Sequence, residues 1–200
     1  SGREPVASAD QAVLAQVVAG KDAGTLRDSV RESGASLGRE LASMPSQNPA
    51  VMEALCAADD QFKFRRYRSA IDGYNETLRL DAQSASLSPV QLAVVYERMG
   101  ASYNKLGLSN EAVRALQRSL QQMSNNASAH YQIALAYSVS GKFTDALRAL
   151  NETFKSVPSS GELRKFMLLA KTDPELDPVR DMTGFQSSMS QYDAHLQARR

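Results

Sequence analysis

The residues of this chain that could perform catalysis or bind a metal are few and scattered. The two histidines, His130 and His195, lie far apart, and neither belongs to an HExxH-type zinc pair. Cys56 is the only cysteine, so it can form neither an intramolecular disulfide nor a thiolate zinc cluster. The sequence contains no phosphate-binding glycine loop and no GxSxG motif. We therefore expect a protein that is not an enzyme and that uses no cofactor and no metal.

A basic and aromatic segment, FKFRRYR at residues 62–68, offers a different chemistry. Its cations are Lys63, Arg65, Arg66 and Arg68. Basic and aromatic side chains together can hold single-stranded nucleic acid through charge and base stacking. The arginines fall between two predicted helices, however, and the sequence has no other basic concentration. We expect a solvated turn and no nucleic-acid partner, with nucleic-acid contact through Lys63–Arg68, or docking of an acidic partner, as lesser alternatives.

Overall composition gives no reason to expect nucleic acid or a membrane as a partner. The 200 residues include 23 basic and 22 acidic ones, so a net charge of +1 creates no attractive field. No apolar run approaches the roughly 20 residues that a membrane-spanning helix needs. The chain begins SGREPV, without methionine. We expect a cytoplasmic location, with the periplasm or an organelle as the alternative if a targeting segment has been removed.

Two stretches of the chain are near copies of each other. MGASYNKLGLSNEAVRAL begins at Met99 and IALAYSVSGKFTDALRAL begins at Ile133, an offset of 34 residues. In each copy, apolar residues follow helical spacing in two segments that are broken at Gly107 or Gly141. A helix–turn–helix unit of this size cannot bury its apolar face alone. Repetition at a fixed period therefore predicts a stacked helical solenoid.

The copies resemble the tetratricopeptide repeat, which has large, large, small and aromatic residues at repeat positions 4, 7, 8 and 11. Its positions 20, 24 and 27 are small or large, and position 32 is often proline. Counted from Ala93, the second unit has Tyr96, Met99, Gly100, Tyr103, Ala112, Leu116, Ser119 and Ser124 at these positions. Counted from Ala127, the third has His130, Ile133, Ala134, Tyr137, Ala146, Leu150, Thr153 and Pro158. The resemblance implies an all-α, tetratricopeptide-type solenoid with helical N- and C-terminal flanks.

A weaker unit precedes these two. Counted from Val51, its second helix has Ala70, Tyr74 and Thr77 at positions 20, 24 and 27. Its first helix places Ala58 at position 8, while Arg65 replaces the turn glycine. We therefore predict an N-terminal arm and linker at 1–50, and three repeats at 51–158 (about 51–84, 93–126 and 127–160). Capping helices are expected at 160–200.

Local signals predict helices in both flanks. Before the second repeat, Ser88 and Gln91 form a capping box around Pro89. In the arm, a short helix ends at Gly20, and an apolar stripe follows at Leu26, Val30, Leu37 and Leu41. This arm would pack on the solenoid, fill its groove or pair with another chain. After the repeats, two amphipathic helices are expected. The apolar stripe of the first consists of Leu163, Phe166, Met167 and Ala170, and that of the second consists of Met182, Phe185, Met189, Tyr192 and Leu196.

The resemblance also implies a peptide groove, lined by repeat positions 2, 5, 9, 12 and 13. These positions are Val94, Glu97, Ala101, Asn104 and Lys105 in the second repeat, and Ser128, Tyr131, Leu135, Ser138 and Val139 in the third. Their mixed chemistry suits a peptide with a few apolar anchors. We expect Tyr131 and Leu135 to hold such an anchor while lying outside the core, and Asn104 to bond the client's backbone. Some proteins of this family bind the acidic C-terminal tails of chaperones through a clamp of Lys, Asn and Arg side chains in the groove. This chain lacks the cations of that clamp, because Glu97 and Ala101 occupy positions that have basic or amide groups there.

The resulting hypothesis is a protein–protein interaction module. It would present the groove to a protein or peptide client, as an adaptor in a larger assembly or as a bacterial secretion or pilus-assembly helper. The alternative is a structural scaffold that forms a homo-oligomer through the flanking helices.

Overall fold

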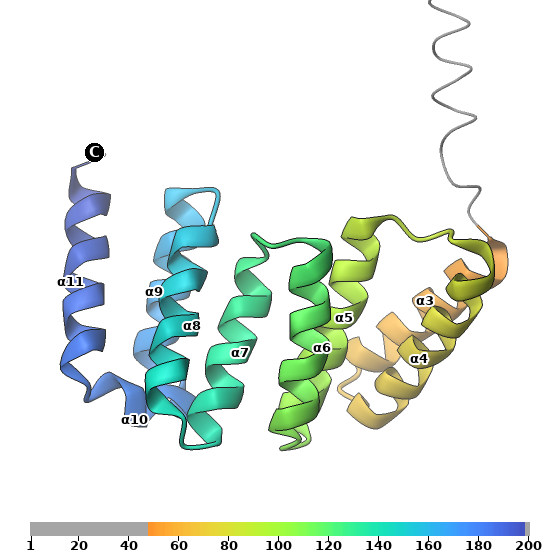
Figure 1. The fold of residues 1–200 in the computed structure, drawn as a ribbon, viewed down its shortest axis with the longest axis horizontal. Helices are drawn as coiled ribbons and strands as arrows, with labels where there is room; N and C mark the ends of the chain where they lie inside the picture. Colours follow the sequence, from red (N-terminus) through yellow and green to blue (C-terminus); the bar gives the residue numbers. More distant parts are fainter. Residues whose placement is uncertain (1–47, 199–200) are drawn as a thin grey trace, which may run out of the picture. The chain divides into compact units, whose positions relative to one another are not determined.

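The computed structural model describes residues 48–198, which form an array of helices joined by short turns (Figure 1). Three helix pairs follow one another: α3 (Pro49–Lys63) with α4 (Tyr67–Ser84), α5 (Pro89–Lys105) with α6 (Ser109–Gln122), and α7 (Ala127–Val139) with α8 (Phe143–Ser156). Next come α9 (Ser160–Thr172), a 3-10 turn (Pro174–Leu176), α10 (Asp177–Arg180) and α11 (Thr183–Gln197). No strand occurs in this described part, and the predicted all-α solenoid is confirmed. Residues 1–47 of the arm expected at 1–50 lie outside the described residues.

Burial confirms the repeat register of the second helices. Positions 20, 24 and 27 of all three repeats are 0% exposed, and they are Ala70, Tyr74, Thr77, Ala112, Leu116, Ser119, Ala146, Leu150 and Thr153. Position 8 is also buried throughout, at Ala58, Gly100 and Ala134. These small residues allow the two helices of a pair to approach closely. In α3 the pattern holds only in part, because Ala57 at position 7 is exposed.

The turns between paired helices use left-handed backbone. Gly107 has φ +74° and Gly141 has φ +73°, as their sequence positions predict. At the matching turn between α3 and α4, Arg65 adopts φ +59° without the freedom of glycine. A non-glycine residue in this region costs roughly 1–2 kcal/mol, so the first turn is strained.

Replacing Arg65 with glycine is expected to stabilise the protein. The left-handed strain disappears, while glycine's greater unfolded-state entropy offsets part of the gain, leaving about 1 kcal/mol. Urea unfolding of the full chain measures the change. As the matched control, Gly107→Ala introduces a side chain at the same kind of position and is expected to destabilise by a similar amount. A lower unfolding midpoint for Arg65→Gly would contradict the assignment of strain.

The predicted capping box is present at the start of α5. The Ser88 Oγ accepts from the Gln91 amide at 3.3 Å, and the Gln91 Oε1 accepts from the Ser88 amide at 2.9 Å. Just before it, the Asp81 carboxylate accepts from the amides of Ser86 and Leu87, both at 2.7 Å. These contacts fix the connection between α4 and α5.

A partly buried polar cluster joins the first helix pair to α5. The Tyr74 hydroxyl donates to Asp59 Oδ1 at 2.8 Å, and Arg98 of α5 forms an ion pair with the same carboxylate. Burial, followed by the bond to Asp59, raises the pKa of Tyr74 above its usual range, so the phenol remains a neutral donor. The cluster links α3, α4 and α5 beside the apolar cluster that contains Tyr74.

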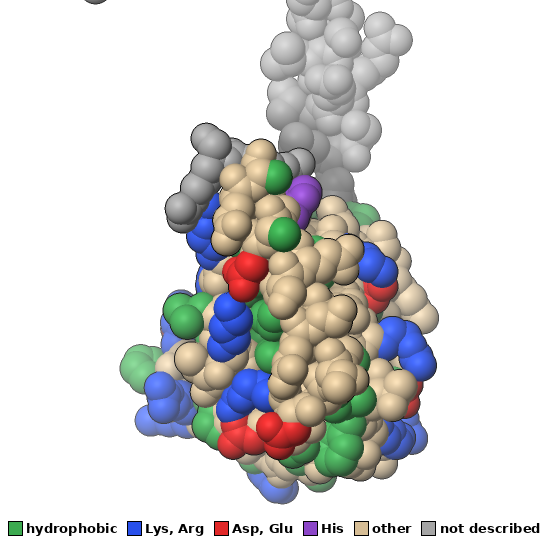
Figure 2. All heavy atoms as spheres, turned by 90° about the vertical axis from the view of Figure 1, so that its left-hand side faces the viewer, with side chains coloured by type: hydrophobic (Ala, Val, Ile, Leu, Met, Phe, Trp, Pro, Cys, Tyr) green, Lys and Arg blue, Asp and Glu red, His purple; other side chains and the backbone are tan. Residues whose placement is uncertain are grey.

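The two apolar stripes that follow the repeats are largely buried. In α9, Leu163, Phe166, Met167 and Ala170 pack inward. In α11, Phe185, Met189 and Leu196 are buried, and the Tyr192 ring meets Phe154 of α8 with centroids 5.1 Å apart. Figure 2 faces the α11 end and shows a broad band of uncharged polar and backbone atoms there. None of the described helices is long and apolar enough to cross a membrane.

Candidate peptide-binding groove

A groove of about 510 Å³ lies between α7 and α9, and we call it the α7–α9 groove. Its walls are side chains of these two helices, and the connections before each helix close one end. The main lining residues are Lys105, Ser128, Tyr131, Gln132, Leu135, Glu162, Lys165, Phe166, Leu169 and Asp173. Because most of them stand on helices, their positions are fixed by the solenoid.

The floor of the α7–α9 groove is apolar. Tyr131 and Leu135 are 5% and 3% exposed, and the Tyr131 ring lies against Phe166 with centroids 5.5 Å apart. The Tyr131 hydroxyl donates to Asp173 Oδ2 at 3.0 Å. Burial, reinforced by the Asp173 charge, raises the pKa of Tyr131, so its phenol stays protonated and holds the end of α9 against α7.

The rim of the groove carries charged and amide groups. Lys105 pairs with Glu175 at 3.3 Å, while the Lys165 ammonium stands 5.7 Å from the centroid of the Phe166 ring. Glu162 is exposed on α9, and Gln132 is half-buried on α7. An apolar floor with a polar rim can bury one or two client side chains while bonding the client's backbone.

The groove contains four of the ten residues that the repeat positions predict. Lys105, Ser128, Tyr131 and Leu135 line it, whereas the other six do not: Val94, Glu97, Ala101, Asn104, Ser138 and Val139. Ala101 is 7% exposed and Val94 is half-buried. Val139, at 57% exposed, points to solvent near the end of α7.

Glu97 and Asn104 already have partners within the solenoid. Ser128 Oγ donates to Glu97 Oε1 at 2.7 Å, and burial raises the pKa of the Glu97 carboxyl. The Asn104 amide nitrogen donates to the Gln132 carbonyl oxygen at 2.9 Å and to its Oε1 at 3.0 Å. These bonds join α5 to α7. The donor of Asn104 that we expected to meet a client is therefore used internally.

Tyr131 and Leu135 differ from expectation in one respect. We expected them to lie outside the core, but they are 5% and 3% exposed, and Ser138 is buried as well. Ser138 Oγ donates to the Glu175 carbonyl oxygen in the 3-10 turn. The reason is that Phe166 and Asp173 contact Tyr131 and the 3-10 turn packs against α7, so residues facing inward from α7 become partly structural.

Sequence reasoning missed the wall that α9 supplies. Lys165, Phe166 and Leu169 line the groove, and Gln132 joins them from α7. The apolar stripe of α9 was visible in the sequence, but it was interpreted only as a cover for the last repeat. Leu163, Phe166, Met167 and Ala170 fall at repeat positions 4, 7, 8 and 11 if counting begins at Ser160, which is a usable signal.

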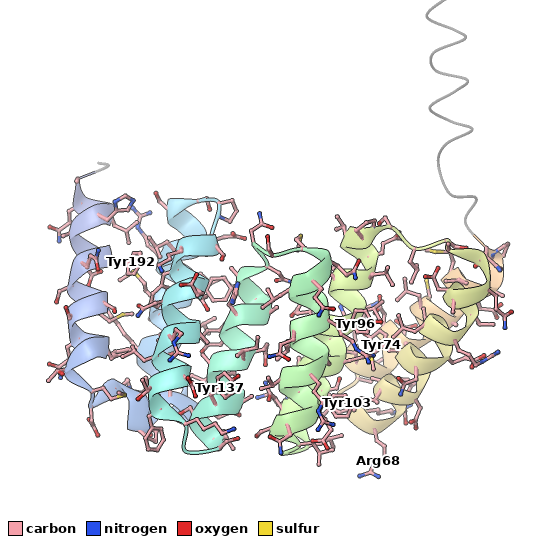
Figure 3. All side chains as sticks on the ribbon, viewed as in Figure 1. Arg68, Tyr74, Tyr96, Tyr103, Tyr137 and Tyr192 are labelled. Atoms are coloured by element: carbon pink, nitrogen blue, oxygen red, sulfur yellow. The ribbon has the colours of Figure 1, made fainter. Side chains whose placement is uncertain are left out.

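The basic segment at residues 62–68 forms the turn between α3 and α4. Phe64 is 69% exposed, and the Arg66 guanidinium carbon lies 5.8 Å from the centroid of its ring. Arg68 points away from the helices (Figure 3). Tyr67 is half-buried, with its ring 6.2 Å from Phe62.

The paired helices and the buried repeat positions define a tetratricopeptide-type array. No family model and no curated protein matches the chain. Among solved structures it is similar to the TPR2B domain of yeast Sti1 in its complex with pHsp70, with 17% identity, a TM-score of 0.48, and 70% of this chain and 97% of that chain covered. It is also similar to YrrB, described as a TPR protein with an unusual peptide-binding site, at 16% identity and a TM-score of 0.47, over 88% of this chain and 87% of that one. At this identity and these TM-scores, neither structure indicates what this chain binds.

Metal chemistry has no support in the described part of the chain. Residues 48–198 contain no group of three or more His, Cys, Asp or Glu side chains placed to hold an ion. His130 is half-buried, with Nε2 3.2 Å from the Ser124 carbonyl oxygen, and Cys56 is exposed on α3.

Proposed function

We propose that this protein is a binding module that holds a segment of a client protein in the α7–α9 groove. The observation that carries the proposal is the combination of an apolar floor and a polar rim in one groove of about 510 Å³. This volume lies within the range of roughly 300–1,000 Å³ that is usual for ligand sites. It accommodates a few side chains of an extended or helical segment.

The main lining residues have different roles in this proposal. Phe166 and Leu169 contact an apolar client side chain, and Tyr131 and Leu135 hold the floor rigid beneath it. Gln132 bonds the client's backbone, while Lys105 and Lys165 attract carboxylates. Because the helices are packed before a client arrives, little ordering entropy is lost on binding.

Two settings suit such a module. In the first it is an adaptor within a larger assembly, and in the second it is a bacterial secretion or pilus-assembly helper.

The alternative, a self-associating scaffold that uses α11, has less support. None of the large exposed hydrophobic side chains in the described residues lies on α11, and the face in Figure 2 is mainly uncharged and polar. Stable self-association normally needs an apolar patch.

A pair of neighbouring leucines tests the groove. Leu169 lines it and is half-buried, whereas Leu168 is 62% exposed and lies outside it. A peptide is first selected from a random display library against the immobilised full chain. Leu169→Lys should then weaken this peptide about 30-fold, the scale of an interface hot spot. Leu168→Lys, the matched control on the preceding residue, should change the affinity less than about twofold.

The readout is the dissociation constant from calorimetry, with circular dichroism to show that both variants are folded. Equal affinity of Leu169→Lys and the parent chain for every selected peptide would contradict the proposed site. So would an equal loss in both lysine variants, since that would reflect added charge rather than the groove.

A further inference from the structure

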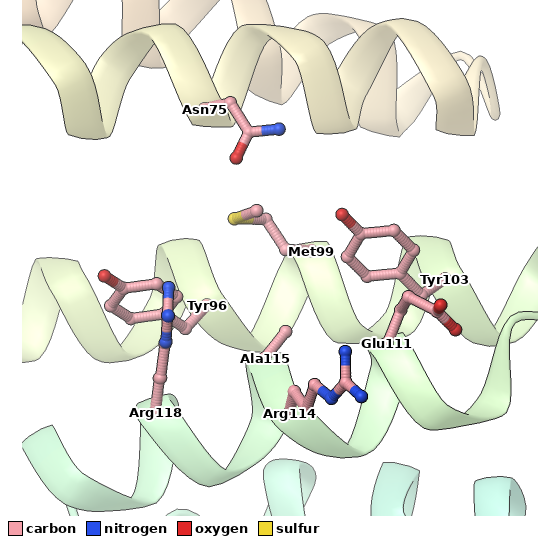
Figure 4. A pocket seen from close by; sticks show the side chains of 8 residues that line it. All are labelled: Asn75, Tyr96, Met99, Tyr103, Glu111, Arg114, Ala115 and Arg118. Atoms are coloured by element: carbon pink, nitrogen blue, oxygen red, sulfur yellow. The ribbon is translucent and has the colours of Figure 1, made fainter.

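A second groove lies where α4, α5 and α6 meet, and we call it the α4–α6 groove (Figure 4). It encloses about 220 Å³. Tyr96, Met99 and Tyr103 extend from α5, and Arg114 and Arg118 stand on α6 (Figure 4). It shares no lining residue with the α7–α9 groove.

The α4–α6 groove is open because core positions lack an apolar cover. Tyr96, Met99 and Tyr103 occupy repeat positions 4, 7 and 11, yet both tyrosines are only half-buried. Opposite them, α4 presents the exposed amide of Asn75. The two apolar clusters of the core also meet here, with Tyr103 packed against both. The rings of Tyr96 and Tyr103 are therefore partly open to solvent, and Met99, which is 6% exposed, forms the base of the groove between them.

Positive charge borders this apolar surface. Arg114 and Arg118 are exposed one helical turn apart, and neither forms a salt bridge within residues 48–198. The Arg118 guanidinium carbon lies 5.8 Å from the centroid of the Tyr96 ring, a cation–π contact that holds it over the groove. Glu111 is the carboxylate of the lining, so two arginines and one glutamate give a net charge of +1.

We propose that the α4–α6 groove is a second binding site, which takes an acidic peptide segment carrying an aromatic or long aliphatic side chain. The apolar side chain lies on Met99 between the rings of Tyr96 and Tyr103. Carboxylates on either side of it pair with Arg114 and Arg118, since guanidinium groups bind carboxylates through two parallel hydrogen bonds. Tyrosine, methionine and arginine are also the residue types enriched in protein interfaces. With two separate grooves, one chain can hold two partners together.

A short synthetic peptide tests this second site. The probe has one phenylalanine between two pairs of acidic residues, with blocked termini and a fluorescent label, and is titrated with the full chain at low ionic strength. We expect saturable binding by anisotropy. Arg114→Glu with Arg118→Glu should weaken it at least tenfold, because two charge-assisted contacts become repulsive. Replacing the phenylalanine of the probe with serine should also weaken binding several-fold.

The matched control has the same change of charge elsewhere. Arg68→Glu with Arg164→Glu alters two exposed arginines that line neither groove, and it should leave the affinity within about twofold. No saturable binding, an equal loss in the control, or equal affinity for the serine probe would overturn the proposal. Loss of this binding in Leu169→Lys, with none in Arg114→Glu/Arg118→Glu, would overturn it in favour of the α7–α9 groove. Failure here leaves the α7–α9 groove standing, because the two sites share no residue.

Discussion

Replacing Tyr131 and Leu135 together with alanine is expected to lower the free energy of unfolding by about 5 kcal/mol. Each truncation of a large buried side chain costs roughly 2–5 kcal/mol, and neighbours in one cluster are not fully additive. The loss includes the contact of Tyr131 with Phe166 and its hydrogen bond to Asp173. Since these contacts hold α9 against α7, the variant should also lose the α7–α9 groove.

Urea unfolding followed by circular dichroism measures this effect. The control is Val139→Ala with Leu168→Ala, which truncates two apolar residues that are 57% and 62% exposed, and it should stay within about 0.5 kcal/mol of the parent. If the Tyr131 and Leu135 double variant unfolded at the same midpoint as the parent, α9 would not cover α7 as described. Tyr131 and Leu135 would then lie outside the core, as their repeat positions predict.

Replacing Gly100 with valine is expected to destabilise the protein by about 3 kcal/mol, the upper end of the usual cost of overpacking. A Cβ at Gly100 would meet Leu116, with the Cδ2 atom only 2.6 Å away. Leu116 is 0% exposed, so it has no free space into which to move. Therefore α5 and α6 would have to separate.

Gly161 provides the comparison for Gly100. It also lies in a helix, but the nearest atom to an added Cβ is the Ser159 Oγ at 3.9 Å. Gly161→Val should be neutral or slightly stabilising, because glycine is an unfavourable helix residue. Thermal unfolding of both variants gives the comparison. Similar melting temperatures for Gly100→Val and Gly161→Val would contradict the close approach of α5 and α6.

The parts of the fold that were predictable from sequence depend on contacts within one repeat. Gly107 and Gly141 end helices by their own backbone freedom, and the Ser88–Gln91 box forms over three residues. The buried positions of α4, α6 and α8 were also predictable, because they recur at fixed places in each repeat.

The parts that were not predictable depend on contacts between distant residues. Tyr131 meets Asp173 across 42 residues, and Asn104 meets Gln132 across 28. The repeat pattern shows which way a side chain points, but not which helix arrives to cover it. The repeat positions placed groove residues on α5 and α7, whereas the contribution of α9 to the α7–α9 groove did not follow from them. The left-handed backbone of Arg65 follows from its place at the turn glycine of the repeat and not from its residue type.

Amide chemical-shift mapping of the isotopically labelled full chain tests the central claim most directly. The selected library peptide is added stepwise, and the shifting residues are assigned. Binding in the α7–α9 groove predicts the largest shifts at residues 128–135 and 162–173. Saturable binding whose shifts are confined to α3 and α4, or to the α4–α6 groove, would contradict the claim that the α7–α9 groove holds the client.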